Sequence, residues 1–314
     1  MEKISDVHLC EKNIIGLENF SSAEIRLVLD VAKDMKKIIC SDVKKLPNLR
    51  GKAIINLFCE PSTRTRTSFE LAGKYLGADV VSINASTSSI VKGESLRDTL
   101  RTVEAMGVDA VVIRHKAEGS AEYASKVIKA VIINAGDGAH AHPSQALLDL
   151  FTIEQFKKRL EGLKVAIVGD ILHSRVARSD IFGMTKMGME IHLAGPKTLL
   201  PRYFEFDGVQ VHDNVEDAIK NADVINVLRI QLERQQAGLF PSPREYARVF
   251  GINDERLKLA KDDVLILHPG PQNKGLEISN AVTYGVHSAI HDQVTNGVAV
   301  RMALLNLTLC GGKI

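Results

Sequence analysis

Short runs of apolar, often β-branched residues alternate along the chain with segments whose apolar positions recur at helical spacing. In the first half, the short runs predict strands at Ala53–Phe58, Asp79–Asn84, Ala110–His115 and Val131–Asn134. Segments with the helical spacing follow Arg64, Glu94 and Ser120. Strands and helices that alternate in this way are typical of a parallel sheet flanked by helices.

A further helix is predicted before the first of these strands. Ser21 and Glu24 have the spacing of a capping box, in which two side chains satisfy free backbone amides at the start of a helix. The apolar residues that follow share one helical face, made of Ile25, Val28, Leu29, Ala32, Met35 and Ile39. The sequence therefore predicts an amphipathic helix that begins beside Ser21.

The second half repeats the alternation. Its strands are predicted at Val165–Asp170, Glu190–Ala194, Val209–His212, Asp223–Leu228 and Val264–His268. Its helices are predicted after Arg175 and at Val215–Ala222, Pro243–Phe250 and Asp254–Ala260. We therefore expect an α/β fold with two domains, each a mostly parallel sheet flanked by helices.

Two helices are expected to cross between these domains. A long helix that begins near Pro143 separates the two series of strands, and Asn296–Leu309 is predicted to be a terminal helix that packs back on the first domain. One domain should therefore comprise residues 1–145 and 296–314, and the other residues 146–295. The length of 314 residues also favours two domains, because one compact core rarely holds so many.

Composition narrows the class of protein. With 45% apolar and 25% charged residues the chain can fill a core, which excludes disorder. Forty Lys and Arg against 38 Asp and Glu leave a net charge of +2, so neither nucleic acid nor a membrane is expected as a partner. No run approaches eighteen apolar residues, residues 1–10 lack a signal-peptide core, and the four cysteines have no CxxC spacing. We expect a cytoplasmic protein with reduced thiols and no structural metal.

Hydroxyl and guanidinium side chains gather directly after the strand Ala53–Phe58, in the stretch Ser62-Thr63-Arg64-Thr65. A helix should begin there, and its free amides and dipole attract anions. Arginine adds planar donors that match phosphate oxygens. The pattern favours an anion site, and the simpler structural alternative is a helix cap with solvated arginines. A P-loop is not expected, because GxxxxGK[ST] is missing.

The stretch from Phe58 to Glu70 resembles the carbamoyl-phosphate signature of the aspartate and ornithine carbamoyltransferase family. His142-Pro143-Ser144-Gln145 is similar to the HPxQ element of that family, and Arg114 stands in its strand-end Ile-Arg-His setting. These matches keep their order and spacing from Ile54 to Arg301. The resemblance implies an enzyme that transfers a carbamoyl group from carbamoyl phosphate to an amine and needs no cofactor or metal.

Other stretches resemble the aspartate branch of the family, namely Glu60-Pro61, Leu228-Arg229-Ile230-Gln231 and the run from Gly169 to Arg175. The Ser-Met-Gly loop and the His-Cys-Leu-Pro segment of ornithine enzymes do not occur, and the latter place reads His268-Pro269-Gly270-Pro271. Aspartate enzymes often carry a larger residue where Gly270 stands. The implied products are N-carbamoyl-L-aspartate and phosphate, as in de novo pyrimidine biosynthesis. The alternative is another amine acceptor such as ornithine.

The resemblance also implies which residues contact carbamoyl phosphate. The phosphate would be held by Ser62, Thr63, Arg64 and Thr65. The carbamoyl oxygen would be polarised by Thr65, Arg114 and His142. Gln145 would accept from the carbamoyl amino group, and the remaining contacts would come from Gly270 and Pro271. The catalytic candidates are therefore Arg64, Thr65, Arg114 and His142, since donors at a developing oxyanion and at the leaving group speed such a reaction.

His142 is expected to act as a neutral donor rather than as a general base. Outside its motif, a histidine that follows a strand is more often a structural hydrogen-bonding residue. No residue supplies an obvious base for the aspartate amine, and the departing phosphate is one candidate for the proton acceptor.

An arginine pair is the candidate site for the two carboxylates of aspartate. Arg175 and Arg229 each follow a predicted strand, and guanidinium binds carboxylate through two parallel hydrogen bonds. The resemblance gives Arg175 chiefly the α-carboxylate, and Arg229 with Gln231 the side-chain carboxylate. Without the resemblance, surface ion pairs would be the simpler explanation for both arginines.

A loop of small residues with one cation runs from Ser86 to Glu94. Its composition alone favours a solvated, mobile loop. In the resembled family the corresponding loop reaches the active site of the neighbouring subunit, where Ser88 and Lys92 match positions that contact substrate. The resemblance thus implies a homotrimer with shared active sites, in which Lys92 also serves the aspartate side. It leaves open an association with separate regulatory or dihydroorotase chains.

The sequence disfavours two other classes of protein. A dinucleotide-dependent oxidoreductase would need GxGxxG after its first strand, and Gly169-Asp170-Ile171 breaks that pattern at the second glycine. A non-catalytic anion-binding protein with a decayed site is disfavoured, because every expected polar position is occupied.

Overall fold

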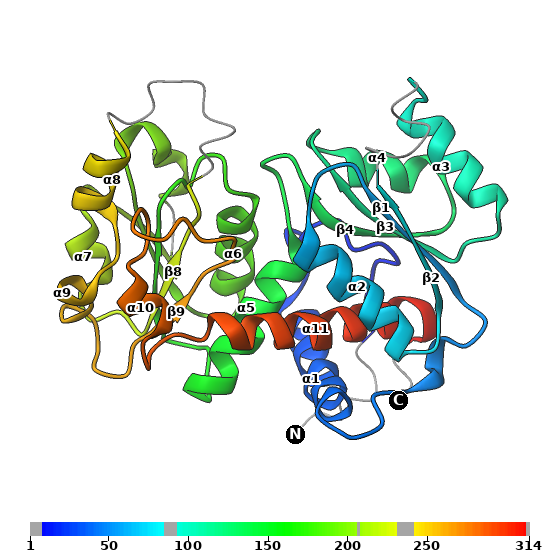
Figure 1. Ribbon diagram of the computed structural model, residues 1–314, viewed down its shortest axis with the longest axis horizontal. Coiled ribbons are helices and arrows are strands. Elements are labelled where there is room, and N and C mark those ends of the chain that lie inside the picture. The colour runs from blue at the N-terminus through cyan, green and yellow to red at the C-terminus, as the bar shows by residue number, and fades with distance from the viewer. Residues whose placement is uncertain (1–7, 85–92, 206–207, 231–241, 312–314) are drawn as a thin grey trace. The chain divides into compact units, whose positions relative to one another are not determined.

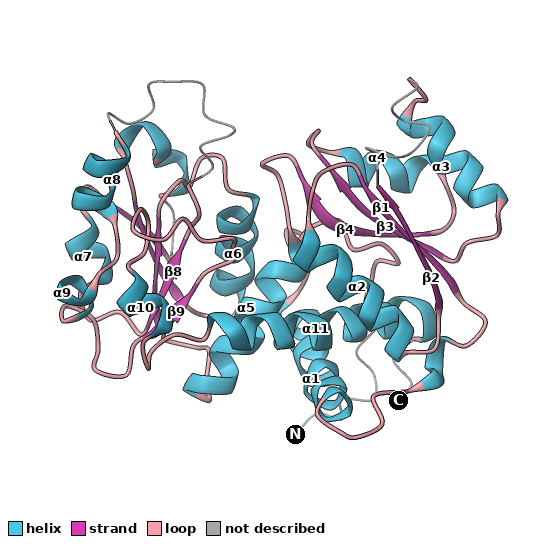
Figure 2. Ribbon diagram, in the orientation of Figure 1, coloured by secondary structure: helices cyan, strands magenta, loops and turns pink. Residues whose placement is uncertain are grey.

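The structure is a computed structural model that describes residues 8–84, 93–205, 208–230 and 242–311 (Figure 1). The chain forms two compact units: residues 1–151 with 294–314 make the first, and residues 152–293 make the second. Each unit holds one parallel sheet flanked by helices (Figure 2), which confirms the predicted fold class. No helix within the described ranges is long and apolar enough to cross a membrane.

The first unit has a four-stranded parallel sheet in the order β2-β1-β3-β4. Its strands are β1 Ala53–Phe58, β2 Asp79–Asn84, β3 Ala110–His115 and β4 Val131–Asp137. Its α-helices are α1 Ser22–Ile39, α2 Thr63–Tyr75, α3 Leu96–Ala105 and α4 Ser120–Val127. The boundary with the second unit falls inside α5 Pro143–Lys157 and again inside α11 Ile290–Cys310.

Side chains that alternate along β1 separate the helices of this unit onto two faces, because successive residues of a strand point to opposite sides. Ile55 and Leu57 pack in one cluster with Leu100 of α3 and Ala121 of α4. On the other face, α2 comes so close that a side chain at Gly73 would collide with Ile54 and Val80. A glycine there lets α2, which follows the candidate anion cluster, lie directly on the sheet.

The second unit has a five-stranded parallel sheet in the order β7-β6-β5-β8-β9. Its strands are β5 Lys164–Val168, β6 Glu190–Ala194, β7 Val209–His212, β8 Val224–Val227 and β9 Leu265–Leu267. Its α-helices are α6 Arg175–Lys186, α7 Val215–Ile219, α8 Pro243–Phe250, α9 Asp254–Leu257 and α10 Asn280–Tyr284. Short 3₁₀ turns occur at Pro47–Leu49 in the first unit and at Lys197–Leu199 and Arg202–Phe204 in the second.

The predicted strands agree closely with the observed ones, and β1, β2, β3, β6 and β7 have the predicted bounds. Two differences matter for the site and its support. β4 continues beyond the predicted Asn134 to Asp137, since its last residues are still paired with β3. α11 begins at Ile290 rather than Asn296, and the short helix α10 was not predicted.

The cap of α1 gives a first prediction. Ser21 accepts from the backbone N–H of Glu24, and the Glu24 carboxylate accepts from the backbone N–H of Ser21 at 2.8 Å. Replacing Ser21 by Ala should therefore lower the free energy of unfolding by about 1 kcal/mol. Urea unfolding, with hydrogen exchange of the amides in the first turn of α1, measures the effect.

Ser62, at the same position of α2, is the matched control. Its side chain makes no capping hydrogen bond, so Ser62→Ala should change the free energy of unfolding much less than Ser21→Ala. Equal losses in the two variants would contradict the assigned cap.

Candidate active site

In both sheets, polar stretches identified in the sequence follow the strand beside which the order of strand addition reverses. All strands of each sheet are parallel, but the order in which the chain adds them reverses once: after β1 and β2 the next strand is added on the other side of β1, and after β5, β6 and β7 the next is added on the other side of β5. In open parallel sheets, ligands bind at such switch points, beyond the carboxyl ends of the strands. The switch points lie between β1 and β3 and between β5 and β8. Each is therefore a candidate ligand site.

The first switch point brings the chain after β1 next to the end of β3. Phe58 pairs with Arg114, and the N–H of Cys59 donates to the Arg114 carbonyl at 2.8 Å. Ser62 is the N-cap of α2 and does not cap it with its side chain, whereas Ser95 of α3 and Ser174 of α6 do cap theirs. Because the Ser62 side chain does not accept from the first backbone amides of α2, these amides can donate to a bound anion.

The side chains of this cluster differ in burial. Thr63 and Arg64 are exposed, whereas Thr65 is buried in the first turn of α2. Arg64 can therefore meet an anion from solvent, and Thr65 has a fixed hydroxyl. An ion pair lies at the same switch point: Nε of Arg114 is 3.5 Å from a carboxylate oxygen of Glu60, and both side chains are mostly buried.

Arg114 is held from two directions. Besides its ion pair with Glu60, its Nη1 donates to the carbonyl of Ala135 in β4 at 3.3 Å. A guanidinium with two fixed partners keeps its plane in one orientation, which suits recognition of one oxyanion geometry. Arg114 is thus a preorganised donor rather than a solvated surface charge.

The element His142-Pro143-Ser144-Gln145 forms the start of α5, and all four residues are buried. Gln145 donates from Nε2 to the Asp149 carboxylate at 3.0 Å, one helical turn further on. The guanidinium of Arg301 on α11 donates to the Ser68 hydroxyl of α2 at 2.8 Å. Burial lowers the pKa of Arg301 to about 10, and the charge of Asp149 opposes that shift. This buried network links the segments that carry the candidate carbamoyl-phosphate residues.

The second switch point carries the turn from Gly169 to Arg175. Gly169 has φ +137°, and a Cβ there would lie 2.9 Å from Cβ of Leu228, so β5 and β8 can end this close together only with glycine. The Asp170 carboxylate accepts from the backbone N–H of His173 and lies 3.1 Å from its Nδ1. These contacts fix the turn that leads to Arg175.

A buried pair of side chains ties α6 to β8. Asn226 of β8 donates to the Asp180 carboxylate of α6 at 2.8 Å, and both residues have no exposed surface. Arg175 is buried in the first turn of α6, and Arg229, partly exposed, follows β8 by two residues. The Asp180–Asn226 pair therefore fixes the two backbones that present these arginines.

The segment His268-Pro269-Gly270-Pro271 follows β9 in the same unit. The N–H of Gly270 donates to Nδ1 of His268 at 2.8 Å, which leaves Nε2 of His268 to donate to the buried Glu277 carboxylate at 3.3 Å. The Asn273 side chain donates to the carbonyl of Ile230 at 2.8 Å. The loop is thus anchored to the segment that carries Arg229.

Cys59 directly follows β1 beside the first switch point. Burial raises the pKa of the Cys59 thiol to about 11, so it stays protonated at neutral pH. No group of three or more His, Cys, Asp or Glu side chains in the described ranges is placed to hold a metal ion.

The structure thus collects the predicted residues into two groups. The first unit holds Ser62, Thr63, Arg64, Thr65, Arg114, His142 and Gln145, and the second holds Arg175, Arg229, Gly270 and Pro271. Ser88, Lys92 and Gln231 lie outside the described residues. Sequence reasoning missed the supporting residues Asp149 and Arg301. The i, i+4 spacing of Gln145 and Asp149 could have revealed the first, whereas nothing local points to the second.

Comparison with known proteins identifies the family. Residues 12–155 match the family described as aspartate/ornithine carbamoyltransferase, carbamoyl-P binding domain, and residues 161–308 match the one described as its Asp/Orn binding domain. The chain belongs to the aspartate/ornithine carbamoyltransferase family.

Relatives named aspartate carbamoyltransferase catalytic subunit align along almost the whole chain. The protein from Pelotomaculum thermopropionicum is 61% identical over 97% of this chain and 98% of its own length. The protein from Moorella thermoacetica is 59% identical over 98% of this chain and 100% of its own length.

Solved structures of both branches of the family are similar to this chain. Ornithine carbamoyltransferase from Pyrococcus furiosus superposes with a TM-score of 0.87 at 29% identity, over 98% of this chain and 100% of its own. Aspartate transcarbamoylase from Trypanosoma cruzi, in complex with N-(phosphonacetyl)-L-aspartic acid, superposes with a TM-score of 0.85 at 32% identity. That match covers 93% of this chain and 94% of the other.

The buried network of the first unit gives a second prediction. Arg301→Met removes the donor to Ser68 and the cation near the buried Asp149, which should cost about 3–5 kcal/mol of unfolding free energy. A double variant that adds Asp149→Asn removes the uncompensated charge, so its loss should be smaller than the sum of the two single losses. Urea unfolding of the four proteins measures this coupling.

Ser68→Ala is the control, because it removes one hydrogen bond and no charge. It should cost less than Arg301→Met. Strictly additive losses for Asp149→Asn and Arg301→Met would show that the two side chains do not interact.

Proposed function

We propose that this chain transfers the carbamoyl group of carbamoyl phosphate to the amine of L-aspartate, giving N-carbamoyl-L-aspartate and phosphate in de novo pyrimidine biosynthesis. The observation that carries the proposal is the first switch point, where the uncapped N-terminus of α2, which includes the exposed Arg64, follows β1 and where Arg114 lies near the end of the neighbouring strand β3. A dianionic phosphate group, such as that of an acyl phosphate, is the ligand class that such donors fit.

The proposed roles follow from the charge that the reaction develops. The amine nitrogen forms a bond to the carbamoyl carbon, the carbon–oxygen bond to phosphate breaks, and the nitrogen loses a proton. Ser62, Thr63 and Arg64 neutralise the leaving phosphate. Thr65, Arg114 and His142 donate to the carbamoyl oxygen as it becomes an oxyanion, and preorganised donors are worth most there.

The other contacts to carbamoyl phosphate orient its amino group. Gln145 accepts from that group with its side-chain oxygen, which is available because the amide nitrogen of Gln145 donates to Asp149. The backbone at Gly270 and Pro271 supplies further acceptors. The bond to Asp149 therefore selects the amide orientation that the substrate requires.

Aspartate is favoured over ornithine as the acceptor. The fold does not decide between them, since a TM-score of 0.87 relates this chain to an ornithine enzyme. The side chains support aspartate: Arg175 and Arg229 provide positive charge for two carboxylates and Gln231 adds a neutral hydrogen-bond donor, whereas ornithine would bring a second ammonium group. Relatives at 54–61% identity are named as aspartate enzymes.

The proposed active form is a cytoplasmic homotrimer with shared active sites, in which Ser88 and Lys92 act on the site of the neighbouring subunit. β2, which leads into this segment, is the outermost strand of its sheet, and Val81 in it is 57% exposed. An apolar side chain on an edge strand is suited to being covered by a second copy of the chain.

Acceptor choice gives the test of the proposed function. With carbamoyl phosphate present, the wild-type protein should turn over L-aspartate and not ornithine or a neutral amino acid. Arg229→Ala should raise the KM for aspartate about 10–100-fold, since one charge-assisted pair is lost, and should leave the Kd of carbamoyl phosphate within about twofold. Steady-state kinetics and calorimetry measure the two quantities.

Arg248→Ala, in an exposed arginine of α8, is the matched control and should behave as wild type. Turnover of ornithine in preference to aspartate would overturn the acceptor. Equal weakening of both ligands by Arg229→Ala would overturn the role of Arg229 alone.

Shared sites are tested with hybrid trimers. Arg64→Ala and Lys92→Ala homotrimers should each be nearly inactive, because every site lacks one cation. If Lys92 serves the neighbouring site, a mixed trimer contains interfaces where an intact Arg64 meets an intact Lys92, so dissociation and reassembly of the two variants together should restore part of the activity.

If both residues served the site of their own chain, every subunit of the mixture would still carry a defect. Verified hybrids without recovered turnover would therefore rule out sharing. Self-reassembled Arg64→Ala protein, treated identically, controls for activity gained by refolding.

A further inference from the structure

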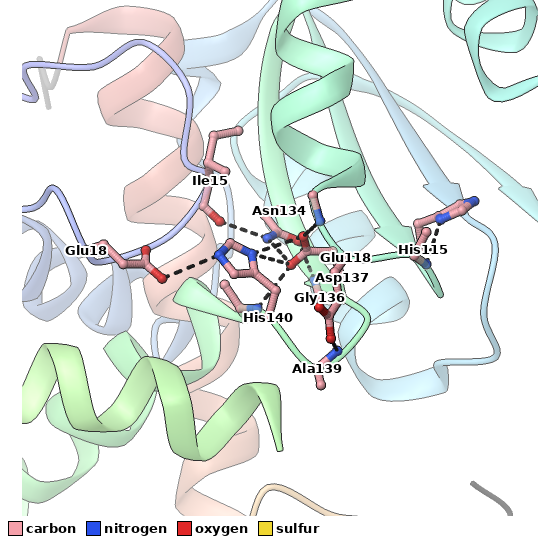
Figure 3. Close-up of polar contacts among 12 residues, drawn as sticks. Ile15, Glu18, His115, Glu118, Asn134, Gly136, Asp137, Ala139 and His140 are labelled. Carbon is pink, nitrogen blue, oxygen red and sulfur yellow. Dashed lines mark hydrogen bonds and ion pairs between the residues drawn. The ribbon is translucent and has the colours of Figure 1, made fainter. Parts of the chain in front are cut away.

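The loop between β4 and α5 is fastened by one buried carboxylate (Figure 3). The Asp137 side chain is 1% exposed and accepts from the N–H of Gly119 and from Nδ2 of Asn134, both at 2.8 Å. It also accepts from the N–H of Ala141 at 3.1 Å. Since Ala141 directly precedes His142, this carboxylate fixes the backbone from which the HPSQ element starts.

His140 lies between this carboxylate and a second one (Figure 3). Its Nδ1 is 3.1 Å from an oxygen of Asp137, and its Nε2 is 3.6 Å from an oxygen of Glu18. A neutral imidazole has one N–H, so one of its nitrogens would then face a carboxylate with a lone pair. The imidazolium carries an N–H on each nitrogen, which can donate to Asp137 on one side and lies at ion-pair distance from Glu18 on the other, so the geometry suits the protonated form.

Glu18 is brought to His140 by the segment before α1. Ile14 adds to the edge of β4, where its N–H donates to the Ile132 carbonyl and its carbonyl accepts from Asn134, both at 2.8 Å. A Cβ at Gly16 would lie 1.9 Å from a carboxylate oxygen of Glu18, so the glycine leaves room for that carboxylate. The position of Glu18 is thus built into the fold of the first unit.

Two further carboxylates belong to this region, and one of them, Glu122, is paired with Lys126. From α4, Glu122 has its pKa lowered chiefly by Lys126, and the charge of His140 contributes to that shift. Glu118, from the loop before α4, accepts from the N–H of Ala139 at 3.2 Å. The surroundings contributed by β4, the segment before α1 and α4 therefore all favour a cation at this position.

We infer that Glu18, His140 and Asp137 form a positioning unit for His142 and Gln145, and that protonated His140 holds the loop in its binding geometry. The inference rests on the proposed function, because it is carbamoyl phosphate that His142 and Gln145 are proposed to contact. These three residues act through the loop and touch no reacting atom. Binding of carbamoyl phosphate should consequently depend on the protonation state of His140.

The test compares wild type, His140→Gln and Glu18→Gln from about pH 5.5 to 8.5, the range in which histidine ordinarily titrates. Calorimetry measures the Kd of carbamoyl phosphate. The ratio of each variant to wild type cancels titration of the ligand itself. For His140→Gln, the ratio should fall from roughly tenfold at the acid end to about one at the alkaline end, since one charge-assisted contact is lost only where His140 is charged.

Glu18→Gln keeps the hydrogen-bonding shape and removes one negative charge, so the imidazolium is less favoured. The pH at which binding weakens should therefore move to lower values. Hydrogen exchange of residues 138–145 in the free protein gives a second readout, and it should be faster in His140→Gln than in wild type at acid pH only. His291→Gln, in an exposed histidine of α11, is the matched control and should behave as wild type throughout.

The outcomes separate the inference from the function on which it rests. In one outcome, the wild-type protein turns over aspartate while His140→Gln has the same Kd for carbamoyl phosphate and the same hydrogen exchange as wild type at every pH. That result would overturn the positioning unit and leave the proposed function standing. An unchanged midpoint in Glu18→Gln overturns the part assigned to Glu18. A wild-type protein that does not bind carbamoyl phosphate overturns the proposed function, and the inference with it.

Discussion

Parallel pairing of β1 with β3, and of β5 with β8, is the constraint on which both candidate sites depend. Parallel neighbours end at the same edge of a sheet, and at a switch point the two chains then turn away from each other. Residues distant in sequence become neighbours in this way, as Cys59 and Arg114 do in the first unit. Arg175 and Arg229 occupy the same kind of position in the second unit.

Buried polar side chains then fix the orientation of the segments that carry the candidate residues. Asp149, Arg301, Asp180 and Asn226 are almost wholly buried, where apolar side chains would avoid the cost of desolvation. Each of them joins a segment that carries candidate residues to an element anchored in a core: Arg301 holds α2, and Asn226 holds α6. Their contribution is orientation more than stability, since a displacement of about 1 Å at a reacting group is costly.

The sequence was sufficient to predict most of the fold, because alternation, capping residues and β-branched runs are local signals. It also supplied the candidate arginines, since Arg114 lies near the end of a strand and Arg64, Arg175 and Arg229 lie in segments that follow strands. Pairing between distant side chains was not predictable: Asp149 and Arg301 are brought together by the packing of two helices, and β4 extends to Asp137 through its pairing with β3. No local pattern predicts that His140 will lie between two carboxylates, because one of them, Glu18, is distant from it in sequence.

The two units also divide the chemistry, and this explains why fold likeness leaves the acceptor open. A phosphate group and a developing oxyanion are common to every carbamoyl transfer from carbamoyl phosphate, so the first unit needs the same donors whichever amine is used. In the proposed function, the acceptor is selected by the charge presented in the second unit, where a few side chains after β5 and β8 would distinguish a carboxylate from an ammonium group. Backbones of aspartate and ornithine enzymes can therefore superpose equally well on this chain, while the proposed role of Arg229 concerns the acceptor alone.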